Sequence, residues 1–293
     1  MAMRVGAFEL AEPVPELHDA RAFAMLKPWV DVGRVGTLVL NRLERHLGAR
    51  ELGKLARSGT FFDFTRYRPY LGYVGGKRVL TIPNTVVNYA TGPDGKGYLF
   101  LHIHEPHAFG EEYCEAIVEL LKHFHIVEYC RVGGFYDAVP HTRPLVVTAT
   151  LSKEQAGLAK GLVSPRRNTY QGPTSIVNLV GDLLAQSEVA VSSAMVHLPQ
   201  YVRLEEDEMG VSRVMQVLCA VFGFPPQLAD STAGQRQYME VSRAVDINPD
   251  VKTLITQLEA YYDKTQAIGP GEGPPALAPD VEHFLKEVSK GLE

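Results

Sequence analysis

The densest group of side chains that could do chemistry lies in the segment Gly133 to Pro144, GGFYDAVPHTRP. Asp137 supplies an acid, His141 a base that titrates near neutral pH, and Arg143 a guanidinium fork for anions. The segment follows a predicted strand, and glycines at a strand end let backbone N–H groups approach a ligand. With Thr142, these residues form a candidate ligand site. The same side chains could instead hold a proline-bounded turn, so both interpretations stay open.

A second segment, Tyr170-Gln171-Gly172-Pro173-Thr174, precedes a predicted apolar helix. Thr174 is placed to cap that helix, and the free N–H groups at a helix start can bind an anion. Tyr170, Gly172 and Thr174 therefore join the candidate site, although helix capping alone also explains the pattern.

The segment Phe61-Phe62-Asp63-Phe64, followed by Arg66 and Arg68, combines aromatic rings with guanidinium groups. This composition is typical of protein interfaces. We predict an interface role for Phe61, Phe62, Asp63 and Arg68. The alternative is a local ion pair between Asp63 and an arginine.

Three histidines, His102, His104 and His107, lie close to Glu105 and suggest a metal site. Pro106 interrupts the segment and the nearby carboxylates lack helical spacing, so we expect no metal here. The chain also lacks the GxGxxG, GxxxxGK[ST], GxSxG and HExxH motifs. We therefore predict no cofactor and no catalytic residue, and we favour a protein that is not an enzyme.

Composition narrows the classes of partner and compartment. The chain has 293 residues, a formal net charge of -5 and 45% hydrophobic residues, which is typical of a globular protein. This charge predicts no nucleic acid partner, and no apolar run is long enough to span a membrane. Three widely separated cysteines form no disulfide framework. With no apolar signal sequence at the start, these features predict a cytoplasmic protein.

The elements that must position the candidate residues follow from hydrophobic spacing. The expected strands cover 22–26, 98–103, 126–132, 145–150 and 189–196, and the expected helices cover 35–47, 113–124, 176–184 and 211–222. Buried strands that alternate with helices predict an α/β protein with a three-layer α/β/α core.

The pattern changes after Gly223-Phe224-Pro225-Pro226, where strands cease. We expect a core of residues 1–228 and a helical extension of residues 229–293, with a Gly/Pro linker near 269–279. Residues 249–262 and 281–288 carry apolar stripes at helical spacing. Those stripes need a cover, either this chain's own core or another subunit.

As a set, these segments resemble the proteasome assembly chaperone 2 family of bacteria and archaea, over roughly residues 20–225. The DxVPHTRP stretch at 137–144 and the YxGPT stretch at 170–174 carry the resemblance most specifically. Asp31-Val32-Gly33, His104-Glu105-Pro106 and the 61–69 segment occur in the same order. The resemblance implies a three-layer core like that of nucleoside phosphorylases, self-association, and for characterised members the assembly of proteasome rings.

Two functions follow as hypotheses. The first is a non-enzymatic assembly or interaction scaffold that forms a homo-oligomer. Such a scaffold could also bind a protein partner. The second is a binder of anionic small molecules, or a phosphorylase- or hydrolase-like enzyme, that uses the loop at residues 133–144. A convergent pocket that holds an anion would discriminate between the two hypotheses.

The end of the chain bears on the partner. Ring-binding chaperones that resemble this family commonly end in a hydrophobic residue, a tyrosine and one last residue. Here the final residues are Ser289-Lys290-Gly291-Leu292-Glu293, without a tyrosine. We therefore expect that the protein does not engage a proteasome ring through its C-terminus.

Overall fold

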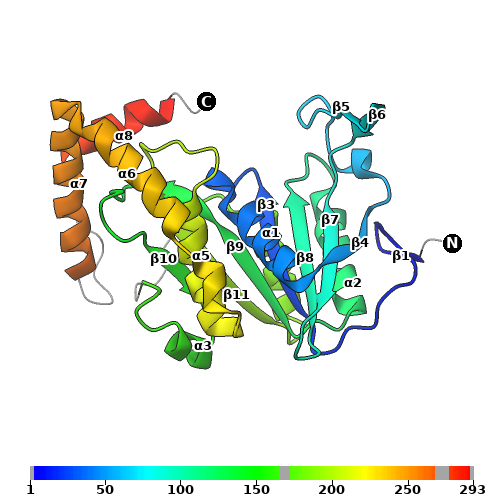
Figure 1. Ribbon diagram of the computed structural model, residues 1–293. Helices are drawn as coiled ribbons and strands as arrows, with labels where there is room; N and C mark the ends of the chain where they lie inside the picture. The colour runs from blue at the N-terminus through cyan, green and yellow to red at the C-terminus, as the bar shows by residue number, and fades with distance from the viewer. Residues whose placement is uncertain (1–2, 165–171, 268–276, 291–293) are drawn as a thin grey trace. The chain divides into compact units, whose positions relative to one another are not determined.

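The computed structural model describes residues 3–164, 172–267 and 277–290 (Figure 1). Its strands are β1 (Met3–Val5), β2 (Phe8–Leu10), β3 (Arg21–Lys27), β4 (Arg50–Leu55), β5 (Tyr70–Val74), β6 (Lys77–Thr81), β7 (Val86–Thr91), β8 (Gly97–His104), β9 (Glu128–Asp137), β10 (Val147–Thr150) and β11 (Ala190–Pro199). Its helices are α1 (Val35–Leu47), α2 (Gly110–His123), α3 (Lys153–Leu158), α4 (Ile176–Ala185), α5 (Glu208–Phe222), α6 (Thr232–Asp246), α7 (Pro249–Ala267) and α8 (Pro279–Lys290).

The predicted α/β class is confirmed, and the sheet is mixed. Nine strands hydrogen-bond in the order β1-β2-β4-β7-β8-β3-β9-β11-β10. Strand β3 pairs in parallel with β8 and β9, whereas β1, β2, β4, β7 and β8 pair antiparallel in succession. All the strands and helices expected before Gly223 are present. Within the described part of the chain, no helix is long and apolar enough to cross a membrane.

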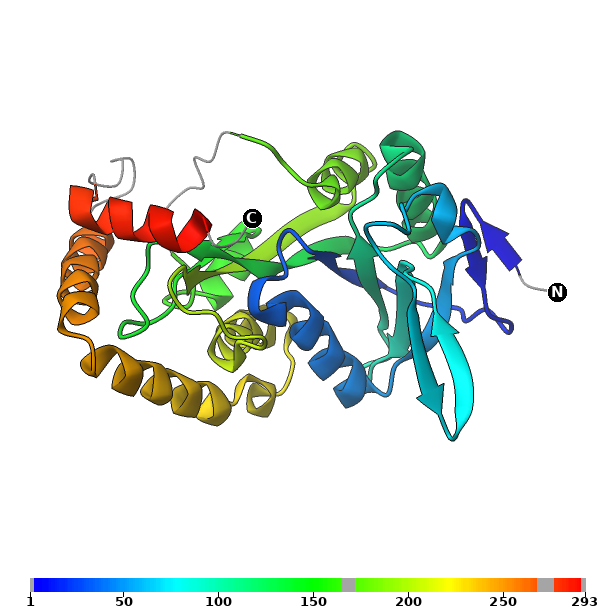
Figure 2. The same cartoon turned by 90° about the horizontal axis from the view of Figure 1, so that it is seen from above.

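The chain divides into two compact units. The first comprises residues 1–29, 40–131 and 173–192. Its helices α2 and α4 lie side by side on one face of its strands, and the α1 segment that belongs to this unit lies on the other face (Figure 2). This is the expected α/β/α layering.

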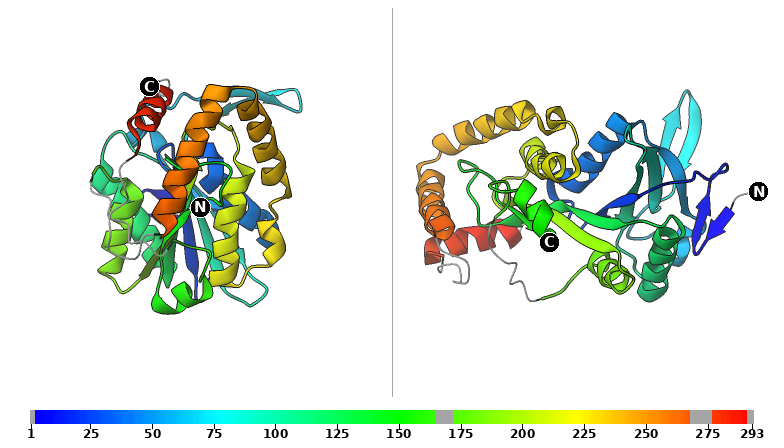
Figure 3. Two further views of the ribbon diagram at one scale, coloured as in Figure 1. Left: turned by 90° about the vertical axis from the view of Figure 1, so that its left-hand side faces the viewer. Right: turned by 90° about the horizontal axis from the view of Figure 1, so that it is seen from below.

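The second unit comprises residues 30–39, 132–172 and 193–293. Strand β10 pairs antiparallel with β11, and α5 packs with α3 and α6. Helices α6, α7 and α8 follow one another around the outside of this unit (Figure 3). The predicted core of residues 1–228 and extension of 229–293 stay a prediction, and most of the expected linker (268–276) lies outside the described residues.

Helices α5 and α7 begin where a side chain satisfies free backbone N–H groups. Asp207 accepts a hydrogen bond from the Gly210 amide at 2.7 Å and starts α5. Asn248 accepts from the amides of Asp250 and Val251 at 3.1 and 3.3 Å, ahead of the proline that opens α7. Helix α5 ends at Gly223, whose φ of 75° favours glycine.

The apolar stripes of α7 and α8 cover each other. Leu258, Val281 and Leu285 form one buried cluster, and Tyr201 and Phe284 pack against it. Of the two covers left open by the sequence, the structure uses the chain itself. These stripes therefore give no reason for a second subunit.

Several elements of the structure have no counterpart in the predicted set: β1, β2, β4, β7, α3, the helix α6 and the hairpin β5–β6. Helix α6 carries only two buried residues, Gly234 and Tyr238, so it lacks an apolar stripe. The hairpin β5–β6 forms a separate two-stranded sheet whose residues are nearly all exposed. Without a buried face, its strands show no alternation of apolar and polar residues.

The two glycines of β9 make room for the chain itself. The Gly134 amide donates a hydrogen bond to the Val30 carbonyl at 2.9 Å, and Asp31 forms a parallel bridge with Gly134. A Cβ atom at Gly133 would lie 2.1 Å from the Val30 carbonyl oxygen. The interpretation of these glycines as an approach for a ligand is therefore wrong, because the backbone at Val30 occupies that position.

We predict that Gly133→Ala lowers the free energy of unfolding by about 1–3 kcal/mol, because the new Cβ must displace backbone rather than a flexible side chain. Denaturant unfolding measures the change. The matched control is Gly157→Ala in α3, where a Cβ meets no atom within 4 Å. That control should be neutral or stabilise the chain by up to about 1 kcal/mol. Equal effects of the two substitutions would contradict this account.

Candidate functional site

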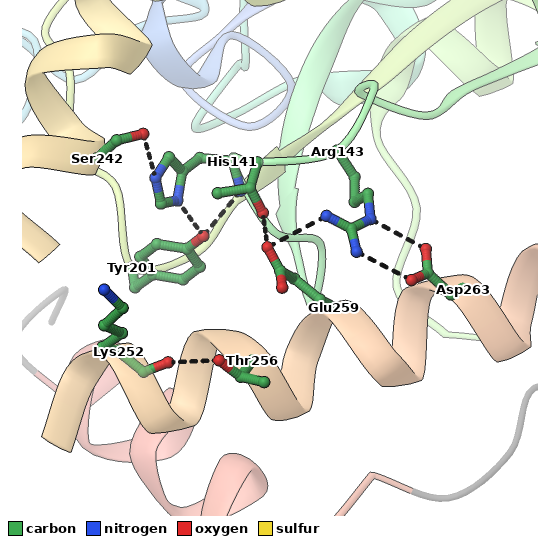
Figure 4. A network of polar contacts seen from close by, with 9 residues as sticks. His141, Arg143, Tyr201, Ser242, Lys252, Thr256, Glu259 and Asp263 are labelled. Carbon is green, nitrogen blue, oxygen red and sulfur yellow. Dashed lines mark hydrogen bonds and ion pairs between the residues drawn. The ribbon is translucent and has the colours of Figure 1, made fainter. Parts of the chain in front are cut away.

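His141 lies in the interior of the second unit and both of its ring nitrogens have partners. The side chain is 5% exposed. Its Nδ1 lies 2.7 Å from the Tyr201 hydroxyl, and its Nε2 lies 3.1 Å from Oγ of Ser242 on α6 (Figure 4). The His141 backbone amide also donates to the Tyr201 hydroxyl at 2.8 Å.

The direction of each hydrogen bond follows from the neighbouring groups. The Ser242 hydroxyl donates to the Tyr238 carbonyl at 3.0 Å, so its oxygen is left to accept from Nε2–H of His141. The Tyr201 oxygen accepts from the His141 amide and donates its own proton to Nδ1. The imidazole is therefore neutral, with its proton on Nε2.

The electrostatic environment agrees with a neutral ring. Burial lowers the pKa of His141 below its ordinary value, and the charges of Glu259 and Asp246 only partly offset this effect. Burial also raises the pKa of Tyr201, so its hydroxyl keeps its proton. Both ring nitrogens serve the fold, and neither is free to transfer a proton to a ligand.

Arg143 and Thr142 bind helix α7. The Arg143 guanidinium donates to both carboxylate oxygens of Asp263 at 3.0 Å each, and to Oε1 of Glu259 at 3.2 Å (Figure 4). The Thr142 hydroxyl donates to the same oxygen of Glu259. The Tyr262 hydroxyl adds a bond to the Pro144 carbonyl at 2.7 Å. The anion-binding fork is thus occupied by carboxylates of the chain's own C-terminal helix.

Asp137 lies apart from these contacts and pairs with His197. Its Oδ2 lies 2.6 Å from Nδ1 of His197, whose Nε2 lies 3.1 Å from the Thr148 hydroxyl. The Ala138 amide donates to Oδ1 at 2.7 Å. Burial alone would raise the pKa of Asp137, but the hydrogen bond and charge of His197, together with the Ala138 amide, hold it below its usual value. These bonds fix the end of β9 against β10 and β11.

A pocket of about 530 Å³ adjoins the loop and is lined in part by His141, Arg143 and Arg213. The Arg213 guanidinium donates to the carbonyls of Leu145 and Leu162 at 3.0 and 3.2 Å. Both arginines on the pocket wall are therefore bound to groups of the chain. An anion would have to compete with these bonds to enter.

A model of the PAC2 family matches residues 25–259, which include the strand-end loop and most of α7. The chain belongs to the PAC2 family. No curated protein matches it by sequence. The resemblance inferred from the motifs at 137–144 and 170–174 is confirmed.

Solved structures share the PAC2 fold of this chain. A protein of unknown function from Corynebacterium glutamicum ATCC 13032 is 20% identical with a TM-score of 0.78, covering 89% of this chain and 98% of that chain. A protein of unknown function from Mycobacterium tuberculosis is 21% identical with a TM-score of 0.75, covering 89% and 90%. PbaB, an archaeal proteasome activator from Pyrococcus furiosus, is 16% identical with a TM-score of 0.64, covering 83% and 98%. Identities this low establish the fold and nothing finer.

The second motif, at residues 170–174, is described only in part. Tyr170 lies outside the described residues, and Gly172 is exposed. Thr174 accepts a hydrogen bond from the Asn178 side chain, and the cap position of α4 is Ser175. The prediction that Thr174 caps this helix is wrong, because its hydroxyl bonds to a side chain in the first turn and not to a backbone amide.

The aromatic pair of the predicted interface faces inward. Phe61 and Phe62 are buried in the first unit, with ring centroids 5.0 and 5.9 Å from that of Tyr113. Asp63 accepts from the Thr65 amide and hydroxyl at 2.8 and 2.7 Å, and Arg68 donates to the Thr65 carbonyl at 3.4 Å. The interface role of this segment stays a prediction. Because Phe61 and Phe62 are buried, its exposed polar residues would have to make the contact with a partner.

The three histidines near β8 have different partners. His102 pairs with Glu44 of α1 at 2.7 Å, and His107 accepts from the Asp63 amide at 3.1 Å. His104 packs against the Phe62 ring, and burial, followed by the charge of Lys27, lowers its pKa to about 4. Among the described residues, no group of three or more histidine, cysteine or acidic side chains could hold a metal ion.

Sequence reasoning missed the partners of the loop. These are Tyr201, Ser242 and Tyr238 around His141, the acids Glu259 and Asp263, and His197. They lie about 60 to 120 residues from the loop, and no local spacing connects them to it.

We predict that His141→Ala lowers the free energy of unfolding by about 1–3 kcal/mol, because the Tyr201 and Ser242 hydroxyls lose a buried partner. Urea unfolding measures the loss. The control is His18→Ala, since His18 is exposed. A variant that unfolds like the parent protein would show that the loop does not depend on this ring.

The lowered pKa of His141 also predicts a dependence on pH. The unfolded chain binds a proton at His141 near pH 6.5, whereas the folded chain binds it only at lower pH. Stability is therefore lost as pH falls below about 6.5. His141→Ala removes this contribution, so the stability gap between parent and variant should narrow between about pH 7 and about pH 5. His104, which stays in both proteins, cancels in the comparison. A gap that widens on acidification would contradict this prediction.

Proposed function

We propose that this PAC2 protein is a non-enzymatic assembly or interaction scaffold that forms a homo-oligomer. The observation that carries the proposal is the state of the loop at 137–144. His141, Thr142 and Arg143, the side chains best suited to chemistry, are bonded to Tyr201 and to helices α6 and α7. To act on a substrate, these groups would first have to release two helices. In this proposal, residues 229–293 extend the core of residues 1–228.

Relatives of similar fold support a role on other proteins. PbaB of Pyrococcus furiosus is a proteasome activator, and a further neighbour from Mycobacterium tuberculosis is a proteasome-assembly chaperone homologue. Both descriptions refer to action on a protein complex. We extend that class of partner, a protein, to this chain.

The cysteines support a cytoplasmic location for the scaffold. Cys114, Cys130 and Cys219 are buried and form no disulfide in the described part of the chain. Burial raises the pKa of the Cys114 thiol to about 11 and that of Cys130 to about 12. Such thiols behave as small apolar side chains, and free cysteines are usual in a reducing compartment.

The rival function is binding of an anionic small molecule in the pocket beside the loop. Arg143 and Arg213 on its wall are the observation in its favour. Their existing bonds to Asp263, Glu259 and the carbonyls of Leu145 and Leu162 weigh against it. Saturable calorimetric binding of inorganic phosphate that Arg213→Gln abolishes would favour this rival over the scaffold.

The scaffold proposal predicts a closed, symmetric oligomer. Sedimentation velocity of the full chain at micromolar concentration should give a species larger than the 32.3 kDa of one chain. Arg143→Lys, which replaces the two-pronged contact with a single charge, should leave the species assembled while exposing α7 to limited proteolysis. A sample that sediments only as one chain would contradict self-association.

A further inference from the structure

The hairpin β5–β6 is the part of the first unit with the least cover. Figure 1 shows it standing clear of the strands of the main sheet. We propose that the hairpin of one copy docks on the α2–α4 layer of a second copy of this chain. This inference rests on the self-association proposed above and names the surfaces that carry it.

The hairpin exposes apolar side chains along its whole length. The exposed set is Tyr70, Leu71, Tyr73, Val74, Val79, Leu80 and Ile82. Tyr73 is 72% exposed and Leu80 is 58% exposed. Scattered exposed apolar residues are normal, but seven of them within thirteen positions mark an interaction surface.

Strand pairing divides this run between the two faces of the hairpin. Leu71 pairs with Leu80, and Tyr73 pairs with Arg78, so these side chains share one face. Tyr70, Val74 and Val79 lie on the other. A lone two-stranded hairpin is only marginally stable in water, so this one gains stability from a surface that covers an apolar face.

The positive charge in and beside the hairpin indicates which kind of surface would cover it. Arg66, Arg68, Lys77 and Arg78 lie between positions 66 and 82, a stretch with no acidic residue, whereas the whole chain carries -5. Among the described residues, neither Lys77 nor Arg78 forms an ion pair. The complementary surface must therefore present apolar side chains beside acidic ones.

Helices α2 and α4 together provide such a surface. The exposed side of α2 carries Glu111, Glu112, Glu115 and Glu119. Residues 111, 115 and 119 are spaced to form one acidic stripe along the helix. The neighbouring α4 exposes Leu179 and Leu183, at 48% and 36%. Figure 2 shows the two helices side by side on one face of the first unit.

A second copy is the occupant that these surfaces favour. The basic apolar hairpin and the acidic apolar layer are both exposed in a single chain, so each copy offers one surface and needs the other. Such a contact joins two different patches, and repeated contacts of this kind close into rings when the rotation permits.

The first test removes the apolar contact. Sedimentation velocity compares the parent chain with Leu71→Ser/Leu80→Ser, which changes one cross-strand pair. We expect the concentration of half-dissociation to rise at least tenfold. The matched control is Met239→Ser/Ile247→Ser on the α6 segment of the second unit, where the side chains are 53% and 83% exposed. That control should assemble like the parent, and circular dichroism confirms that each variant is folded.

The second test exchanges the charges. Lys77→Glu/Arg78→Glu and Glu111→Lys/Glu115→Lys should each weaken assembly at least tenfold. All four substitutions in one chain restore opposite charges at the exchanged positions, and assembly should return to within about threefold of the parent.

Each outcome has one meaning. A parent chain that stays monomeric overturns both the proposed self-association and this contact. A parent oligomer that survives the serine pair overturns the hairpin contact and leaves the scaffold proposal standing. Loss of assembly in both charge variants without recovery in the fourfold variant overturns the α2–α4 layer as the acceptor.

Discussion

The buried imidazole of His141 is the contact on which the second unit depends. Its two nitrogens join the hydroxyl of Tyr201 to that of Ser242, and so connect the end of a strand to helix α6. A buried polar group costs free energy unless it is hydrogen-bonded. The His141 ring and the hydroxyls of Tyr201 and Ser242 therefore stabilise one another. The Ser242 hydroxyl donates in turn to the backbone carbonyl of Tyr238, whose side-chain hydroxyl donates to Asp207 at the start of α5. One side chain thereby positions two helices.

The same logic extends along the edge where the strands end. Open α/β sheets usually bind ligands outside the carboxyl ends of their strands. In the second unit, the chain's own groups take up much of this space. The Val30 carbonyl fits against Gly133 and Gly134, and the carboxylates of Glu259 and Asp263 hold Arg143. Side chains of types that could do chemistry, such as His141 and Arg143, therefore hold helices α6 and α7 in place.

The surface of the first unit, by contrast, leaves apolar side chains exposed to water. Its interior rings, such as Phe61, Phe62 and Tyr113, are packed against one another, while the hairpin leaves tyrosines and leucines in water. Unburied apolar area retains a driving force for association. The loop groups best suited to chemistry bond within the chain, and residues 70–82 expose seven large apolar side chains. Both observations support the proposed scaffold.

The sequence by itself determined the α/β class, most core elements and the family. Strand and helix periods depend on neighbours only two to four residues apart, and the 137–144 motif is contiguous. The sequence also singled out Asp137, His141, Thr142 and Arg143 as candidate site residues, but left their role open. Only the tertiary structure shows what these side chains bind, because the partners of a histidine or arginine can lie more than fifty residues away, as Tyr201 and Asp263 do. The hairpin β5–β6 was not predicted from the sequence. It has no buried face in a single chain, so its strands show no alternation of apolar and polar residues.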